Sequence, residues 1–230
     1  MRDPLRWMPE MTIDYSQARE KMVEQQIRPW DVLDLRVLDV LSRLPRETFV
    51  PHSHRAVAYA DLEIPLGHGQ YMMKPVIEGR MLQALDLQAG EDVLEIGTGS
   101  GFVSACLSEL GREVVSLEIE AALAGTARAN LDAAGLGSNI RIETADALTW
   151  TPGERRFDAI CVTAAVTEIP TKFLSWLRPG GRLFAICGRA PVMEAVRIHA
   201  NAGTPRTESL FETDLAYYLR GTAPVPQFTF

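Results

Sequence analysis

The sequence has little cysteine, and no spacing that would put its cysteines to chemical use. The three cysteines, Cys106, Cys161 and Cys187, are odd in number and form no CxxC pair. Disulfide frameworks and structural zinc sites need paired or closely spaced cysteines, so we expect reduced, buried thiols instead. His52 and His54 form a possible metal pair, but no cysteine or acidic cluster completes a ligand set. The sequence therefore predicts no metal site.

Long apolar runs and an excess of positive charge are also missing. No run approaches the roughly 18 apolar residues of a membrane-spanning helix, and residues 1–9 lack the apolar stretch of a secretory signal. Lys and Arg number 23 against 30 Asp and Glu, which gives a net charge of −7. A surface that neutralises a phosphate backbone needs the opposite balance. We therefore expect a cytoplasmic protein with neither a membrane nor a nucleic acid as its partner; the oligomeric state is left open.

What is present is the composition of a globular α/β protein. Apolar residues make up 47% of the 230 residues and charged residues 23%, without an internal repeat or a low-complexity stretch. This length suits one domain over residues 1–230. We expect a helical N-terminal region with a loop over about 1–90, an α/β core over about 91–216, and an extended tail over 217–230.

The N-terminal region is predicted to contain three helices. Ser16 is a candidate cap for the first, which would end at Pro29, and Asp31 is a candidate cap for the second, which would end before Pro45. An irregular segment is expected over residues 64–70. Pro75 suits the first turn of the third helix, because proline has no backbone N–H to leave unpaired.

Short apolar runs alternate with helical stretches from Asp92 onward. Strands are expected at 93–96, 113–117, 139–143, 157–162 and 182–187, with helices at 102–110 and 121–134 and two further strands near 195–200 and 208–215. Strands separated by helices and buried on both faces predict an α/β, Rossmann-like, doubly wound and mostly parallel sheet. Such sheets bind their ligands at the carboxyl ends of the strands.

A glycine-rich turn lies between the first of these strands and its helix. It consists of Gly97, Thr98, Gly99, Ser100 and Gly101. Glycines allow a ligand to approach the backbone, and the N-terminus of the helix offers free N–H groups. The dinucleotide pattern G-x-G-x-x-G would need glycine at 102, where Phe102 stands, and Glu95 would repel a diphosphate. A carboxylate at Glu95 suits an ammonium group instead.

Acidic residues also follow the next two strands. Glu118 can accept hydrogen bonds from both hydroxyls of a ribose, and Asp146 with the Ala147 amide can contact the edge of an adenine. Each acid by itself is explained equally well as a helix cap or a solvated charge. Together with the glycine turn, they predict a cofactor with an amino-acid head, a ribose and an adenine, which are the parts of S-adenosyl-L-methionine.

Several segments resemble the class I methyltransferases, and more closely the protein-L-isoaspartate O-methyltransferase family. The resemblance spans about residues 46–188. It rests on Phe49-Val50-Pro51, Ala58-Tyr59-Ala60-Asp61, Ile64-Pro65-Leu66-Gly67-His68-Gly69-Gln70, the glycine turn, residues 157–165 and Leu177-Arg178-Pro179-Gly180-Gly181. It implies that Thr163 belongs to the wall between the cofactor and the acceptor, and that His68 and Gln70 help to shape the acceptor pocket.

The resemblance breaks at the acceptor loop. In the family this loop reads Thr-x-Ser-x-Pro, and its serine hydroxyl lies beside the methyl donor and the acceptor carboxylate. Here Tyr71 stands at the threonine, Met73 at the serine and Lys74 before the proline. A thioether donates no hydrogen bond, so Met73 puts the isoaspartyl substrate in doubt without affecting the cofactor. Lys74 could hold an anionic acceptor or be a surface lysine, and Tyr71 could contact the acceptor or fill the core.

Three functional interpretations remain open from the sequence. The preferred one is an S-adenosyl-L-methionine-dependent methyltransferase that acts on a carboxylate or other oxygen nucleophile of a small molecule, peptide or protein. No side chain is identified as a catalytic acid or base, since an anionic acceptor needs none. The alternatives are isoaspartyl repair itself, and a non-catalytic protein that binds the cofactor.

Overall fold

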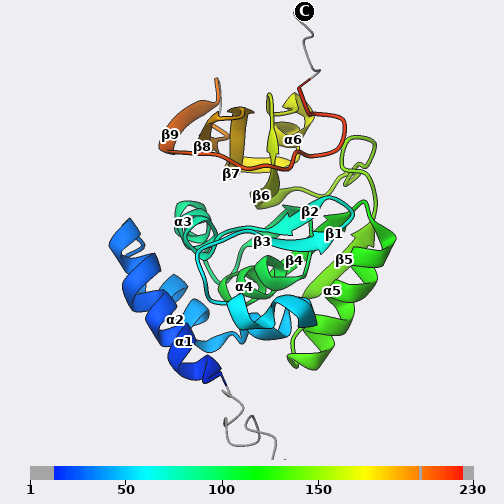
Figure 1. The fold of residues 1–230 in the computed structure, drawn as a ribbon. Coiled ribbons are helices and arrows are strands. Elements are labelled where there is room, and N and C mark those ends of the chain that lie inside the picture. Colours follow the sequence, from blue (N-terminus) through cyan, green and yellow to red (C-terminus); the bar gives the residue numbers. More distant parts are fainter. Residues whose placement is uncertain (1–12, 202–203, 225–230) are drawn as a thin grey trace, which may run out of the picture.

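The computed structural model describes residues 13–201 and 204–224, which fold around one large sheet (Figure 1). Its strand order is β5-β4-β3-β6-β7-β8-β9. The strands β3 to β7 run parallel, and β8 and β9 pair antiparallel. This confirms the predicted Rossmann-like sheet and its two final strands. The bounds are β3 Asp92–Ile96, β4 Glu113–Glu118, β5 Ile140–Thr144, β6 Phe157–Val166, β7 Leu177–Arg189, β8 Val192–His199 and β9 Arg206–Thr213.

The direction of strand addition reverses between β3 and β6. From β3 the chain moves outward through β4 to β5, and β6 then pairs with the other side of β3. Open parallel sheets bind ligands in the crevice outside the carboxyl ends of their strands at such a switch point. The topology therefore directs attention to the ends of β3, β4, β5 and β6.

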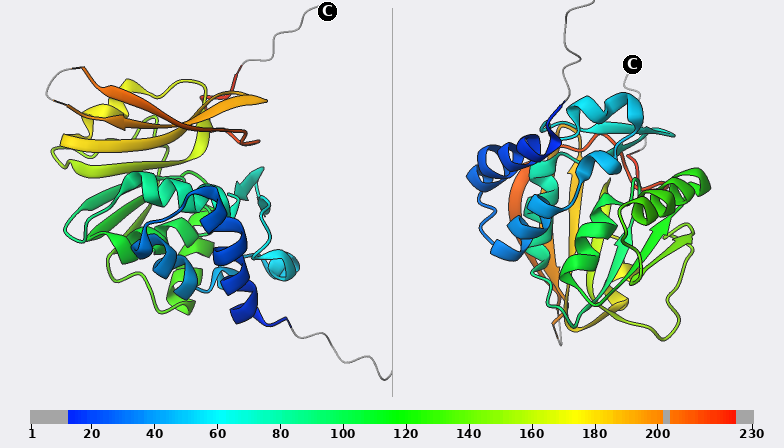
Figure 2. Two further views of the ribbon diagram at one scale, coloured as in Figure 1. Left: turned by 90° about the vertical axis from the view of Figure 1, so that its left-hand side faces the viewer. Right: turned by 90° about the horizontal axis from the view of Figure 1, so that it is seen from below.

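Side chains of the sheet alternate between two apolar layers. Along β3, Val93 packs into the layer that also contains α1 (Tyr15–Met22), α2 (Leu35–Arg43), α3 (Pro75–Leu85) and α4 (Phe102–Leu110). Figure 2 shows how these helices lie against the sheet. Leu94 and Ile96 pack into the opposite layer, which α6 (Thr171–Ser175) covers. The helix α5 (Ala121–Ala133) packs beside α4. None of the helices within residues 13–201 and 204–224 has the length and hydrophobicity to cross a bilayer.

The first two helices are capped by other residues than those expected. The Asp14 carboxylate, and not Ser16, accepts the capping hydrogen bond of α1 at 3.0 Å. Beyond α1 the chain continues through a π-helical turn (Val23–Ile27) and a 3-10 turn (Arg28–Trp30). Asp31 ends that turn with φ 60°, and Asp34 caps α2 instead. Asp31 and Asp34 can both cap a helix, so the packing of α2 decides which of the two does.

Residues 64–72, part of which was expected to be irregular, form the hairpin β1 (Ile64–Gly67) and β2 (Gln70–Met72). Its two turn residues, His68 and Gly69, have φ values of 55° and 68°. Positive φ at both positions is the requirement of a type I′ turn. The strands are too short to show an alternating pattern, which is why the sequence did not predict them. Pro75 begins α3, as expected.

After β9 the chain returns to the carboxyl end of β6. The Ala165 amide donates a hydrogen bond to the Tyr217 carbonyl at 3.0 Å, and the Leu219 amide donates to the Ala165 carbonyl at 2.8 Å. These two bonds fix residues 217–219, which the sequence assigned only to an extended tail. The end of that tail, residues 225–230, lies outside the described residues.

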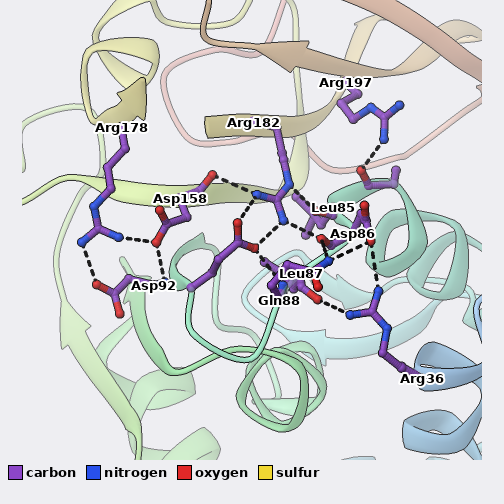
Figure 3. A network of polar contacts seen from close by, with 12 residues as sticks. Arg36, Leu85, Asp86, Leu87, Gln88, Asp92, Asp158, Arg178, Arg182 and Arg197 are labelled. Atoms are coloured by element: carbon purple, nitrogen blue, oxygen red, sulfur yellow. Dashed lines mark hydrogen bonds and ion pairs between the residues drawn. The ribbon is translucent and has the colours of Figure 1, made fainter. Parts of the chain in front are cut away.

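A network of ion pairs lies at the opposite, amino ends of the strands (Figure 3). Arg182 of β7 binds both carboxylate oxygens of Glu91, at 2.8 and 2.6 Å, and also donates to the Asp86 carbonyl at 2.7 Å. Arg178 bridges Asp92 at 2.9 Å and Asp158. Most of these partners lie in or beside the connection between α3 and β3, so the network fixes α3 relative to the sheet.

Candidate functional site

A cavity of about 800 Å³, counted with the open space at its mouth, lies at the carboxyl ends of β3 to β6. Its wall combines the glycine turn, the ends of β4, β5 and β6, the hairpin, α3 and the segment after β9. The predicted site residues on this wall are Gly97, Thr98, Gly99, Ser100, Glu118, Asp146, Ala147, Thr163, Gln70, Tyr71 and Met73.

The glycine turn has a backbone that other residues would not adopt. Gly97 has φ 102°, and a Cβ atom there would overlap the Thr163 hydroxyl. Gly99 has φ 55° and lies on the cavity wall, where a Cβ atom would crowd the Leu66 side chain at 3.3 Å. Gly101 does not line the cavity and precedes α4. The turn therefore presents bare backbone to the cavity.

Glu118, at the end of β4, is buried and supports the turn. One carboxylate oxygen accepts a hydrogen bond from the Gly99 amide at 2.8 Å, and the other accepts one from the Glu120 amide at 2.9 Å. A carboxylate offers about four acceptor positions. Glu118 thus retains acceptor capacity for two hydroxyl groups while it holds the turn.

Asp146 and Ala147 follow β5. The Asp146 Oδ1 atom accepts a hydrogen bond from the Leu148 amide at 2.7 Å. Within the described chain, the Ala147 amide donates to no acceptor. An open carboxylate oxygen beside an open N–H group matches the donor–acceptor edge of an adenine.

Glu95 does not line the cavity. It points to the α4 side of the sheet, where its Oε2 atom accepts hydrogen bonds from Ser104 and, at 2.5 Å, from Ser116. Its Oε1 atom is buried and has no partner among the described residues. Burial raises the pKa of Glu95 to about 8, although the two serine hydroxyls oppose this shift. The expected contact with an ammonium group stays a prediction.

Thr163 joins the end of β6 to the glycine turn. Its hydroxyl lies 3.0 Å from the Ile96 carbonyl and 2.6 Å from the Gly97 carbonyl. The hydroxyl is thus satisfied by the chain itself. Thr163 also lines the cavity, as the resemblance implied.

The acceptor loop is brought to the cavity only in part. Gln70, Tyr71 and the buried Met73 line it, but His68 and Lys74 do not. The His68 side chain is 47% exposed and has Glu120 at 3.8 Å as its nearest charged partner. The suggested role of Lys74 in binding an anionic acceptor therefore gains no geometric support.

Among the residues of the cavity wall that were not found from the sequence, two carry buried polar groups. Glu78 of α3 is buried and paired with the buried Arg46, whose guanidinium also donates to the Met73 carbonyl at 2.8 Å. Burial raises the pKa of Glu78, although Arg46 lowers it in part. Tyr217 is the second. No motif marks either one; a charged residue within the apolar face of α3 was the available signal for Glu78.

Among the described residues, the cysteines form no disulfide and the potential metal ligands form no metal site. All three cysteines are unpaired, and burial raises the pKa of the Cys187 thiol to about 11. Within residues 13–201 and 204–224, no three His, Cys, Asp or Glu side chains are grouped to hold a metal ion.

The sequence of this chain is similar to those of known proteins of one family. The family described as protein-L-isoaspartate(D-aspartate) O-methyltransferase matches residues 17–208. The protein-L-isoaspartate O-methyltransferase of Methanoculleus marisnigri is 41% identical over 189 residues, which are 82% of this chain and 86% of that protein. The protein of the same name from Myxococcus xanthus is 42% identical over 183 residues, covering 78% and 86%.

A solved structure has the same fold. It is a putative protein-L-isoaspartate O-methyltransferase from Plasmodium falciparum in complex with S-adenosyl-L-homocysteine, with a TM-score of 0.75 and 17% identity over 91% of this chain and 99% of that one. The predicted family and the prediction of an S-adenosyl-L-methionine-dependent methyltransferase are thereby confirmed. The chain belongs to the protein-L-isoaspartate O-methyltransferase family.

Proposed function

We propose that this protein transfers a methyl group from S-adenosyl-L-methionine to an isoaspartyl-type carboxylate of a peptide or protein. The observation that carries the proposal is the single cavity shared by the glycine turn and the acceptor loop, from Gly97 on one side to Met73 on the other. Relatives at about 41% identity that bear the isoaspartyl name support the choice of acceptor.

The residues present suit the cofactor. The bare backbone at Gly99 and the remaining acceptor capacity of Glu118 suit the amino-acid head and the ribose. The open Ala147 amide suits the adenine. The buried Oε1 atom of Glu95 has no partner among the described residues, and a bridging water between it and the ammonium group of the ligand would satisfy it.

Methyl transfer to a carboxylate requires little acid–base catalysis by the protein. Bound S-adenosyl-L-methionine supplies a methyl group activated on a sulfonium. An acceptor carboxylate is already a nucleophile at neutral pH, so the chain has to align it with the methyl group and exclude water. Apolar side chains that line the cavity, among them Leu66, Phe102 and Val103, limit the access of water to it. We also propose a cytoplasmic location, because three unpaired thiols suit a reducing compartment.

The test compares two synthetic peptides that differ only in an isoaspartyl or a normal aspartyl residue. We expect S-adenosyl-L-homocysteine to form with the isoaspartyl peptide and not with the aspartyl control. Calorimetry with S-adenosyl-L-homocysteine in the same preparation shows whether the cofactor half is intact.

Isoaspartyl methylation was one of the two alternatives from the sequence, and the other two interpretations, the preferred one included, each have their own outcome. Cofactor binding without turnover on any carboxylate would favour a non-catalytic protein. Turnover on another oxygen nucleophile, with none on the isoaspartyl peptide, would replace the proposed acceptor.

A further inference from the structure

The acceptor half of the cavity lacks a hydrogen-bond donor where the family has one. Met73, at the position of the family's serine, is buried and carries a thioether. A carboxylate placed in an apolar wall without a donor is strongly disfavoured, because its desolvation is not compensated. A donor other than the side chain at position 73 is therefore required if this protein binds such an acceptor.

Tyr217 is positioned to supply that donor. Its backbone is hydrogen-bonded to Ala165 at the end of β6, and its ring stacks on Tyr71 of the acceptor loop, with 5.8 Å between ring centroids and 25° between planes. The ring lines the cavity. Two independent contacts, one to the sheet and one to the acceptor loop, thus hold this side chain beside Met73's loop.

The hydroxyl of Tyr217 is an anomaly within the protein. The side chain is only 6% exposed, and its oxygen is buried without a hydrogen-bond partner among residues 13–201 and 204–224. Buried polar atoms in native proteins almost always have a partner, so an orphan at the wall of a binding cavity points to a partner that arrives with the ligand.

The surroundings keep this hydroxyl protonated. Burial raises the pKa of Tyr217 well above its usual value, and the nearby carboxyls of Glu63 and Glu78 raise it further, while Arg46 lowers it in part. A protonated phenol is a donor, and a carboxylate is an acceptor only. The two groups are complementary.

We propose that the Tyr217 hydroxyl donates a hydrogen bond to the acceptor carboxylate and so takes over the contact that Met73 cannot make. This inference rests on the proposed function, because it concerns the same acceptor. It makes the segment after β9, and not the loop before α3, the source of the acceptor's hydrogen-bond donor.

The first experiment removes only the hydroxyl, with Tyr217→Phe. We expect kcat/KM for the isoaspartyl peptide to fall roughly 10- to 100-fold, the range for a lost hydrogen bond to a charged group. The Kd for S-adenosyl-L-homocysteine should stay within about twofold, and the Tm should be unchanged or higher, since an unsatisfied buried group is removed.

The matched control is Tyr59→Phe. Tyr59 is buried to the same degree, at 7% exposure, but its hydroxyl is already bonded to Glu47 and does not line the cavity. This variant should show the opposite pattern, with a lower Tm and unchanged kcat/KM. A merely structural role of Tyr217 would instead make the two variants behave alike.

A second experiment asks whether positions 73 and 217 serve the same oxygen. In Tyr217→Phe combined with Met73→Ser, the new loop hydroxyl should restore at least part of the lost kcat/KM. The inference is overturned if Tyr217→Phe leaves kcat/KM within about twofold, or if the added serine restores nothing. A wild-type protein that neither methylates the isoaspartyl peptide nor binds it with S-adenosyl-L-homocysteine present would overturn the proposed function as well.

Discussion

The two ends of the central sheet differ in whether their buried charged and polar groups have partners. At the amino ends, Arg178 and Arg182 bind the carboxylates of Asp92, Asp158 and Glu91, as Figure 3 shows. At the carboxyl ends, by contrast, two buried oxygen atoms have no partner among the described residues. They are Oε1 of Glu95 and the hydroxyl oxygen of Tyr217. The charged groups of the amino end pair with one another, whereas the partners proposed for these two oxygen atoms belong to the ligands or to bound water.

The titration of the carboxyl groups follows the same division. Burial alone would raise the pKa values of Glu91 and Asp92, but hydrogen bonds from arginines outweigh it and lower both. Burial dominates for Glu95 and Glu78, whose pKa values are raised. The arginines therefore favour the ionised forms of Glu91 and Asp92, whereas burial favours the protonated forms of Glu95 and Glu78, in Glu78 even though it pairs with Arg46.

The largest expected effect concerns the carboxyl end. Gly97→Ala should abolish measurable binding of S-adenosyl-L-homocysteine, a loss of roughly 100-fold or more, because the added Cβ overlaps Thr163 and the positive φ strains the turn. Calorimetry measures this. The control is Gly90→Ala, since no atom lies within 4 Å of a Cβ at Gly90 and its φ is not positive. Retained affinity in the Gly97 variant would show that the turn does not require its observed shape.

The next effect concerns the amino end. Arg182→Ala should lower the free energy of unfolding by about 3 kcal/mol, because Glu91 and the end of α3 lose a largely buried partner. Urea unfolding measures the loss, and cofactor affinity should change less than about twofold. Arg112→Ala is the comparison: its side chain is 58% exposed, so the loss of stability should be clearly smaller than for Arg182→Ala. An equal loss in both variants would remove the distinction between buried and exposed pairs.

The last effect is a pH dependence, which is small for each pH unit but extends over several units. Because the folded-state pKa of Glu95 is raised to about 8 from 4.5, the folded protein keeps a proton that the unfolded chain has released between these values. Stability without cofactor should therefore fall as pH rises through this window and level off above it, by on the order of 1 kcal/mol per pH unit at most. Glu95→Gln should flatten this fall in Tm measurements. The same slope in variant and wild type would assign it to other groups, Glu78 first among them.

Local sequence determined much of the fold and of the cofactor half. The β3–turn–α4 unit could be predicted from two local signals. Gly97, Gly99 and Gly101 can adopt the positive φ values that the turn requires, and short apolar runs alternate with helical segments. The acids Glu118 and Asp146 follow strands in the sequence, so a parallel sheet necessarily brings them to one edge.

Only the tertiary structure decided which groups face the cavity. Glu95 and Ile96 are neighbours in the sequence, yet the pleat of β3 turns the first toward α4 and the second toward the cavity. Tyr217 reaches the site because its carbonyl accepts a hydrogen bond from the Ala165 amide, and Ala165 lies far from it in the sequence. Such contacts leave no local pattern in the sequence, because they arise when packing brings distant backbone segments together. The local sequence likewise does not show that Asp34, and not Asp31, caps α2.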